Sequence, residues 1–232
     1  MNIAVIPARG GSKRIPRKNI KKFCGQPMIS YAITAAKQSG LFDHIVVSTD
    51  DEEVARIANQ WGAETPFLRP VELSNDYVAT APVITHSIEA CQNLGWVFDN
   101  VCCIYPCVPF IQVDDLRGAF ISLTTNDADY CFPVTEFPSA IQRALKLLTN
   151  GKMQPFFSEF EITRTQDLEP AYYDAGQFYW GKPDTWLINP RIHSSGIGYI
   201  IPNWRVVDID TSDDWVRAEL IYRSIINKTV TI

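Results

Sequence analysis

The sequence has no long apolar run. A membrane-spanning helix needs roughly 18 or more consecutive apolar residues, and no such run occurs in the 232 residues. The first apolar stretch is soon interrupted by Pro7, Ala8 and Arg9, so it predicts a strand and not a signal peptide. We therefore expect a cytoplasmic protein without a membrane partner.

The sequence also has no excess of basic over acidic residues and no closely spaced pair of cysteines of the C-x-x-C type. The net charge of -5 argues against a nucleic-acid partner. The six cysteines contain no C-x-x-C pair, so we expect reduced thiols that pack as small apolar side chains. A zinc site built from Cys103 and Cys107 is a minor alternative.

What the chain does have is a basic, glycine-containing loop directly after an apolar strand over residues 3–6. The loop has neither P-loop nor dinucleotide-fold spacing. It holds five cations, which are Arg9, Lys13, Arg14, Arg17 and Lys18. Fixed positive charge at the end of a buried strand suits a phosphate. We expect side chains to bind the phosphates, with Gly10 and Gly11 allowing close approach; a solvated surface loop is the alternative.

Apolar strands alternate with helical patterns along most of the chain. Strands are expected at 3–6, 44–48, 64–68, 101–105, 129–134, 176–180 and 198–201, and helices at 28–38, 53–61, 81–93, 113–124 and 212–226. Such alternation predicts a three-layer α/β fold with a mostly parallel sheet. Ligands in such sheets bind at the carboxyl ends of strands, where the basic loop lies.

Residues 137–173 break this alternation. The segment is aromatic and includes a hairpin pattern with Asn150-Gly151 at its turn. We expect one core domain, formed by 1–136 and 174–232, with an inserted arm at 137–173. The arm's apolar side chains would be covered most simply by a second subunit.

Two acidic residues lie close together near the C-terminus. In a strand, Asp208 and Asp210 would share one face, with Ile209 on the other. Such a pair suits Mg²⁺, which takes one or two protein carboxylates and fills its shell with water and phosphate. Residues 211–213 suit a helix N-cap, so capping is a compatible alternative.

The loop at 68–82 contains Arg69 and Thr80. This pattern is as consistent with a capped loop as with a ligand-binding site.

Five segments, in order along the chain, resemble a known family: ARGGSKRIPRKN, VSTDD, LRPVELSND, YPCVPF and VDIDT. They resemble the cytidylyltransferases that activate keto-acid sugars, which include sialic acid (N-acylneuraminate) and pseudaminic acid enzymes. The resemblance implies a Rossmann-like nucleotidyltransferase fold, a homodimer with a protruding dimerisation arm, and Mg²⁺ as cofactor. It also implies the reaction of CTP with a nine-carbon sugar acid to give a CMP-sugar and diphosphate.

The resemblance assigns nucleotide contacts to this chain. Arg9, Lys13 and Lys18 would act on the triphosphate during catalysis. The remaining nucleotide-binding residues would be Ala8, Gly10, Gly11, Ser12, Asn19, Arg69 and Thr80. Asp208 and Asp210 match the family's metal carboxylates.

The sugar contacts that the resemblance implies are Tyr105, Gln142, Arg143, Arg164, Tyr173, Gln177 and Tyr179, those at 142–164 reaching a partner's site from the arm. Where the sialic acid enzymes have R-x-N-G-x-x-Y, this chain has YYDAGQFYW. Tyr173 and Ala175 replace the polar Arg and Asn, while Gly176 and Tyr179 are kept. The segment resembles that of the pseudaminic acid enzymes and implies a less polar pocket for pseudaminic acid. N-acetylneuraminic and legionaminic acid remain alternatives.

The expected mechanism is in-line attack of the sugar's anomeric hydroxyl on the α-phosphorus of CTP. Such transfer depends on positioning and charge neutralisation more than on covalent participation. No histidine is required, and His44, His86 and His193 are expected to be structural. A non-catalytic nucleotide-binding module is the alternative from another class, although mere binding would not require a metal pair.

Overall fold

The computed structural model describes residues 1–229. Its main sheet has the order β11-β6-β10-β5-β1-β4, and β9 pairs with β6 outside this path. The strands are β1 (Asn2–Pro7), β4 (His44–Ser48), β5 (Asn100–Ile104), β6 (Tyr130–Glu136), β9 (Tyr172–Asp174), β10 (Phe178–Gly181) and β11 (Gly196–Ile200). β1 is parallel to β4 and β5, and β11 is parallel to β6. β10 is antiparallel to both β5 and β6, so β5 and β6 run in the same direction. The sheet is therefore mainly parallel, as predicted.

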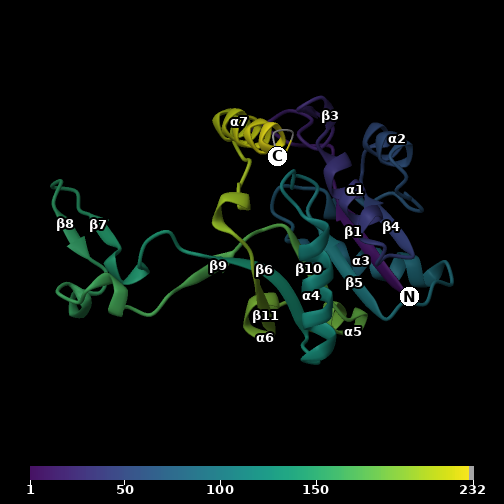
Figure 1. The fold of residues 1–232 in the computed structure, drawn as a ribbon. Helices are drawn as coiled ribbons and strands as arrows, with labels where there is room; N and C mark the ends of the chain where they lie inside the picture. Colours follow the sequence, from purple (N-terminus) through teal and green to yellow (C-terminus); the bar gives the residue numbers. More distant parts are fainter. Residues whose placement is uncertain (230–232) are drawn as a thin grey trace.

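Helices cover both faces of this sheet (Figure 1). They are α1 (Ile29–Ser39), α2 (Glu52–Gln60), α3 (Thr80–Asn93), α4 (Val113–Thr125), α5 (Pro183–Ile188), α6 (Ile192–Ser195) and α7 (Ser212–Thr229). Alternate residues of β1 enter two different cores. Ala4 and Ile6 pack with the buried faces of α1, α2 and α4, whereas Ile3 and Val5 pack with α3 and α5. The three-layer prediction is thereby confirmed.

A third apolar cluster anchors the segments that border the site. Ile15 of the basic loop and Ile209 both pack with Trp215 of α7. The short hairpin of β2 (Lys22–Phe23) and β3 (Gln26–Pro27) adds Phe23 to the same cluster. The basic loop and the segment around Asp208 and Asp210 are thus fixed to one core.

The segment at 137–173 projects away from the core (Figure 1). It carries β7 (Leu145–Leu147), β8 (Met153–Pro155) and the short 3-10 helices η2 (Ile141–Arg143), η3 (Ser158–Phe160) and η4 (Thr165–Asp167). The predicted hairpin is confirmed: Gly151 adopts a φ of 79°, in the left-handed region that glycine tolerates. Many of its apolar side chains are exposed, including Leu147 at 73% and Met153 at 54%.

Two predicted strands are wrong. Residues 64–68 form only a single bridge, between Glu64 and Val46, before Pro66 removes a donor from the ladder. Residues 206–210 form no strand either, although Ile209 is buried as the alternation suggested. The strand expected at 176–180 begins at Phe178, because Gly176 lies in a turn with a φ of 62°.

All six cysteines are free thiols, and Cys91, Cys102, Cys103 and Cys131 are buried. Burial raises the pKa of Cys102 and Cys103. Cys103 and Cys107 belong to no group of three or more His, Cys, Asp or Glu residues that could hold a metal ion, and residues 1–229 contain no such group. Within the same range, no helix is long and apolar enough to cross a membrane.

Candidate active site

Two adjoining cavities open at the carboxyl ends of β1 and β5. The first, of about 650 Å³, lies between the basic loop and the segment from Arg69 to Thr80. The second, of about 490 Å³, lies between Tyr173–Gln177 and the segment from Arg205 to Asp210. Both cavities are lined by Lys18, Asn19, Tyr105, Pro106 and Asp210. These shared residues mark the place where ligands of the two cavities would meet.

The first cavity is bordered by cations that are paired with carboxylates. Arg9 and Lys13 lie 2.6 and 2.5 Å from the two oxygens of Asp76. Lys18 Nζ donates to the Ile209 carbonyl at 2.7 Å and lies 3.4 Å from Asp210. The arrangement suits an anionic ligand, because a polyphosphate can replace the internal carboxylates as the partner of these cations.

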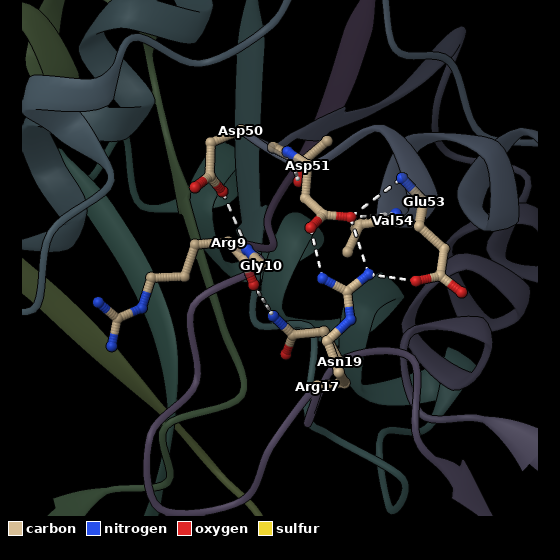
Figure 2. Close-up of polar contacts among 9 residues, drawn as sticks. Arg9, Gly10, Arg17, Asn19, Asp50, Asp51, Glu53 and Val54 are labelled. Atoms are coloured by element: carbon tan, nitrogen blue, oxygen red, sulfur yellow. Dashed lines mark hydrogen bonds and ion pairs between the residues drawn. The ribbon is translucent and has the colours of Figure 1, made fainter.

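The basic loop is held by contacts on its other side (Figure 2). The Gly10 N–H donates to Asp50 at 2.9 Å, and Asn19 Nδ2 donates to the Arg9 carbonyl at 2.9 Å. Arg17 turns away from Arg9 to contact Asp51 and Glu53. Arg17 therefore fixes the loop and does not line either cavity.

The two glycines of the loop differ in their surroundings. A Cβ on Gly10 would come within 2.5 Å of an Asp51 oxygen, whereas a Cβ on Gly11 would meet open space. The Gly10 backbone thus lies close to the Asp51 side chain, with no room for a side chain at position 10. The Ala8 N–H is bonded to the Ser48 carbonyl at 2.9 Å. Ala8, Gly10 and Gly11 do not line the first cavity, whereas Ser12 and Asn19 do.

Arg69 is a buried cation in the wall of the first cavity. It is 6% exposed, and its guanidinium donates to the Oγ and the carbonyl oxygen of Ser48. Burial lowers the pKa of Arg69 to about 10. A buried guanidinium without a carboxylate partner is costly, so an anionic or carbonyl ligand in this cavity would stabilise it.

The second cavity contains three of the predicted sugar residues, which are Tyr105, Tyr173 and Gln177. Gln177 is 4% exposed, and its Nε2 donates to the Arg205 carbonyl at 2.9 Å. Tyr179 is buried beneath the cavity wall, where its hydroxyl donates to Asp174 at 2.7 Å. The sequence segment that departs from the sialic acid pattern thus does form this wall.

Several residues of these cavities were not predicted from the sequence. Arg205 lines the second cavity and forms a buried, two-pronged ion pair with Asp115 of α4. Asp174 accepts from Tyr179 and lies 2.7 Å from His193 Nε2. Asp76 pairs with two loop cations. The Asp115 pair joins residues 90 positions apart, so no local pattern signals it.

The arm residues Gln142, Arg143 and Arg164 lie outside both cavities. Gln142 donates to the Glu169 carbonyl, Arg143 to the carbonyls of Glu161 and Thr163, and Arg164 to Asp167. Each contact is within the arm itself, so a role for these residues at a sugar requires a second copy of the chain.

Asp208 and Asp210 both line the second cavity, on either side of the buried Ile209. Asp210 also faces the first cavity and lies 2.8 Å from Arg14. Two carboxylates beside a cavity that is lined by cations fit the needs of Mg²⁺, which requires only one or two protein ligands. The predicted helix cap lies just beyond them: the Thr211 hydroxyl accepts from the Asp214 N–H at 3.2 Å.

The three histidines have separate surroundings. His44 stacks on Trp96, with ring centroids 3.8 Å apart, and lies 2.9 Å from Glu64. His86 packs edge-on against Phe67. Neither lines a cavity described above, whereas His193 contacts the cavity residue Asp174.

The chain is similar to known proteins over nearly its full length. Residues 3–182 match the family model described as "Cytidylyltransferase". The chain is 43% identical to the pseudaminic acid cytidylyltransferase of Campylobacter jejuni subsp. jejuni serotype O:2, covering 96% of each chain. It is 31% identical to the CMP-N,N'-diacetyllegionaminic acid synthase of Legionella pneumophila, covering 94% of each.

A solved structure shares the fold. It is that of a CMP:2-keto-3-deoxy-manno-octonic acid synthetase complexed with CTP, with a TM-score of 0.69 and 16% identity over 96% of this chain and 98% of that one. The nucleotidyltransferase fold expected from the sequence is thereby confirmed. The family model and the full-length relatives agree, and the chain belongs to the cytidylyltransferase family.

Proposed function

We propose that this enzyme transfers CMP from CTP to pseudaminic acid and releases diphosphate. The observation that carries the proposal is the pair of adjoining cavities that share Lys18, Tyr105 and Asp210. One cavity is bordered by cations suited to a triphosphate. The other is bordered by the segment that resembles pseudaminic acid enzymes, and the 43% identical relative bears that name.

CTP occupies the first cavity in this proposal. Arg9 and Lys13 exchange their contact with Asp76 for the triphosphate oxygens, and Lys18 neutralises charge next to the α-phosphate. Arg69 and Thr80 also line this cavity, where they can donate to the cytidine. Ser12 and Asn19 line the cavity as well, and Ala8, Gly10 and Gly11 belong to the loop that borders it.

The sugar acid occupies the second cavity, with Tyr105, Tyr173 and Gln177 around it. Its anomeric oxygen attacks the α-phosphorus, the bond from that phosphorus to the bridging oxygen breaks, and diphosphate leaves. The residues shared by the two cavities hold the reactants in line, which accounts for much of the rate of such reactions.

Asp208 and Asp210 would hold Mg²⁺ in this proposal. When bound, the ion would neutralise charge on the phosphate oxygens. Asp210 lies at the junction of the cavities, whereas Asp208 faces only the second. The buried Ile209 between them keeps both carboxylates on the solvent side of the core.

The arm at 137–173 completes the site of a partner subunit in this proposal, and the enzyme is a homodimer. Exposed apolar side chains such as Leu147 and Met153 supply the area that a dimer would bury. Gln142, Arg143 and Arg164 would then reach the sugar of the other subunit. The remaining residues, 1–136 and 174–232, form the core domain, and the protein acts in the cytoplasm.

A competition experiment tests the choice of sugar. The enzyme is incubated with CTP, Mg²⁺ and equal amounts of pseudaminic, N,N'-diacetyllegionaminic and N-acetylneuraminic acid, and the CMP-sugars are identified by mass spectrometry. We expect CMP-pseudaminic acid to dominate. A preference for either of the other sugars would contradict the substrate, and release of no CMP-sugar would favour a non-catalytic nucleotide-binding module.

A further inference from the structure

The first cavity has more cations than carboxylates, and most of these cations are paired within the protein. Among the described residues, its charged lining consists of Arg9, Lys13, Arg14, Lys18, Arg69, Asp76 and Asp210. Asp76 Oδ1 lies 2.6 Å from Arg9 Nη1, and Asp76 Oδ2 lies 2.5 Å from Lys13 Nζ. Asp210 likewise contacts Arg14 and Lys18. An anion that binds any of these paired cations therefore competes with a carboxylate.

Asp210 belongs to the proposed metal pair, whereas Asp76 has been given no role in the reaction. Its two partners, Arg9 and Lys13, are the cations that the proposed function gives to the triphosphate. Lys13 and Arg9 lower the pKa of Asp76, so this carboxyl is negatively charged at neutral pH. Carboxylate and phosphate oxygens accept hydrogen bonds from the same ammonium and guanidinium donors. Asp76 and a triphosphate therefore compete for the same two side chains.

Water reaches both ion pairs of Asp76. The side chains of Asp76 and Arg9 are 30% and 33% exposed, and that of Lys13 is 83% exposed. Exposed ion pairs contribute little free energy, because water and salt screen them. A polyphosphate carries several negative charges and can contact both cations at once, so it can displace Asp76. The carboxylate thus lowers the affinity for such a ligand without preventing its binding.

Asp76 lies on a short turn that precedes α3 and has contacts of its own. The Asn75 Oδ1 accepts from the Tyr77 N–H at 2.9 Å, and Asn75 Nδ2 donates to the Glu72 carbonyl at 3.0 Å. These hydrogen bonds on either side of Asp76 involve neither of its cations. The turn therefore does not depend on the ion pairs, and the carboxylate can return to its partners when a ligand leaves.

We propose that Asp76 is a specificity-determining residue, which competes with polyphosphates for Arg9 and Lys13 and thereby favours the release of diphosphate. This inference rests on the proposed function, in which Lys18 lies next to the α-phosphate. The β- and γ-phosphates then contact Arg9 and Lys13. CTP and diphosphate both have to displace Asp76, whereas CMP has a single phosphate, which lies at Lys18. The competition therefore acts on CTP and diphosphate and leaves CMP unaffected.

The variant Asp76→Asn tests the competition by isothermal titration calorimetry with CTP, inorganic diphosphate and CMP, each in the presence of EDTA. The amide has no charge to hold the two cations. We expect the Kd for CTP and that for diphosphate to fall by a similar factor of about 3- to 10-fold, the size of two exposed ion pairs. The Kd for CMP should change by less than about twofold. An unchanged or raised Kd for diphosphate, or an equal gain for CMP, would overturn the inference.

Two further variants provide matched controls. Asp76→Glu keeps the charge and should keep the Kd for diphosphate within about twofold of the wild-type value. Glu72→Gln removes an exposed negative charge from the same segment but lines neither cavity, so it should leave the Kd unchanged. A gain in affinity from Glu72→Gln as large as that from Asp76→Asn would contradict a role for this particular carboxylate.

A double variant tests whether Asp76 acts through the contact itself. In a Lys13→Met background, Asp76 competes for Arg9 alone, so adding Asp76→Asn should lower the Kd for diphosphate by a smaller factor than in the wild-type background. An undiminished factor would mean that Asp76 acts at a distance, and it would overturn the inference. These titrations need no sugar. Failure to form any CMP-sugar therefore bears on the proposed function, whereas an unchanged Kd for diphosphate in Asp76→Asn bears on this inference.

Discussion

Arg17 and Asp51 join the basic loop to the start of α2. The Arg17 guanidinium contacts both carboxylate oxygens of Asp51, with Nη2 2.9 Å from Oδ1. The same Oδ1 accepts from the N–H groups of Glu53 and Val54, so Asp51 also caps the helix. A single carboxylate therefore fixes both the helix and the loop that borders the first cavity (Figure 2).

The first prediction concerns the charge of Asp51. Arg17 holds the pKa of the Asp51 carboxyl below its ordinary value of 3.8. The resulting stabilisation is complete above that value and is lost as the pH falls through the depressed pKa. In Asp51→Asn the amide oxygen still caps α2, so we expect the free energy of unfolding at neutral pH to fall by only about 0.5–1 kcal/mol.

Urea unfolding of wild type and Asp51→Asn at several pH values measures this effect. The difference in free energy of unfolding should be constant from neutral pH to about pH 5 and should shrink at more acidic pH. A difference that stays the same down to pH 3 would show that the ion pair does not depress the pKa.

The second prediction concerns Lys18, which lies at the junction of the cavities. Lys18→Ala should lower kcat/KM by ~10²–10³, the usual cost of removing one preorganised charge from a transition state. Lys21→Ala is the matched control, since Lys21 lies over the Trp215 ring at 4.6 Å and lines neither cavity. Equal losses in the two variants would mean that general positive charge, and not the position of Lys18, matters.

The third prediction concerns Asp210 as a metal ligand. Asp210→Asn should lower kcat by ~10²–10³ and raise the Mg²⁺ concentration needed for half-maximal rate. Asp213→Asn removes a neighbouring carboxylate that lines neither cavity, and its Mg²⁺ dependence should match that of wild type. If Asp210→Asn kept the wild-type rate and Mg²⁺ dependence, the metal proposal would fail.

The fourth prediction concerns the arm. If Arg164 acts in the partner's site, each site combines Lys18 of one subunit with Arg164 of the other. When a Lys18→Ala chain pairs with an Arg164→Ala chain, both changes fall in the same site. A heterodimer of the two then keeps one intact site, so random co-assembly should restore about a quarter of the wild-type rate. The measurement is the activity of co-expressed chains compared with that of separately expressed chains mixed just before the assay. No recovery after co-expression, with heterodimers verified, would place Arg164 at its own chain's site or at none.

The sequence predicted what local patterns determine. The apolar stretch at 3–6 and the alternation after it indicated a three-layer fold, because burial on both faces of a parallel strand leaves a continuous apolar run. Asn150-Gly151 indicated the hairpin turn. Ser12, Lys18 and Asn19 do line a cavity, as expected of a basic loop that follows the central strand.

Contacts between distant residues were beyond such patterns. Asp174 and His193 lie 19 positions apart, and Arg205 and Asp115 lie 90 apart. Asp174 lies in β9 and His193 in α6, whereas Asp115 lies in α4 and Arg205 follows β11, so each pair forms only when the chain folds. The expected strand at 64–68 lies beside the free edge of β4, but Pro66 has no N–H to donate, so the pairing stops at the bridge between Glu64 and Val46.

The most direct test of the account is diphosphate release from CTP with Mg²⁺, measured in parallel with pseudaminic acid and with N-acetylneuraminic acid. We predict release with pseudaminic acid and little or none with N-acetylneuraminic acid, because Tyr173 and Ala175 stand where the sialic acid pattern has Arg and Asn. Release with N-acetylneuraminic acid alone would contradict the account of the sugar cavity. Absence of release with both would contradict the proposed reaction.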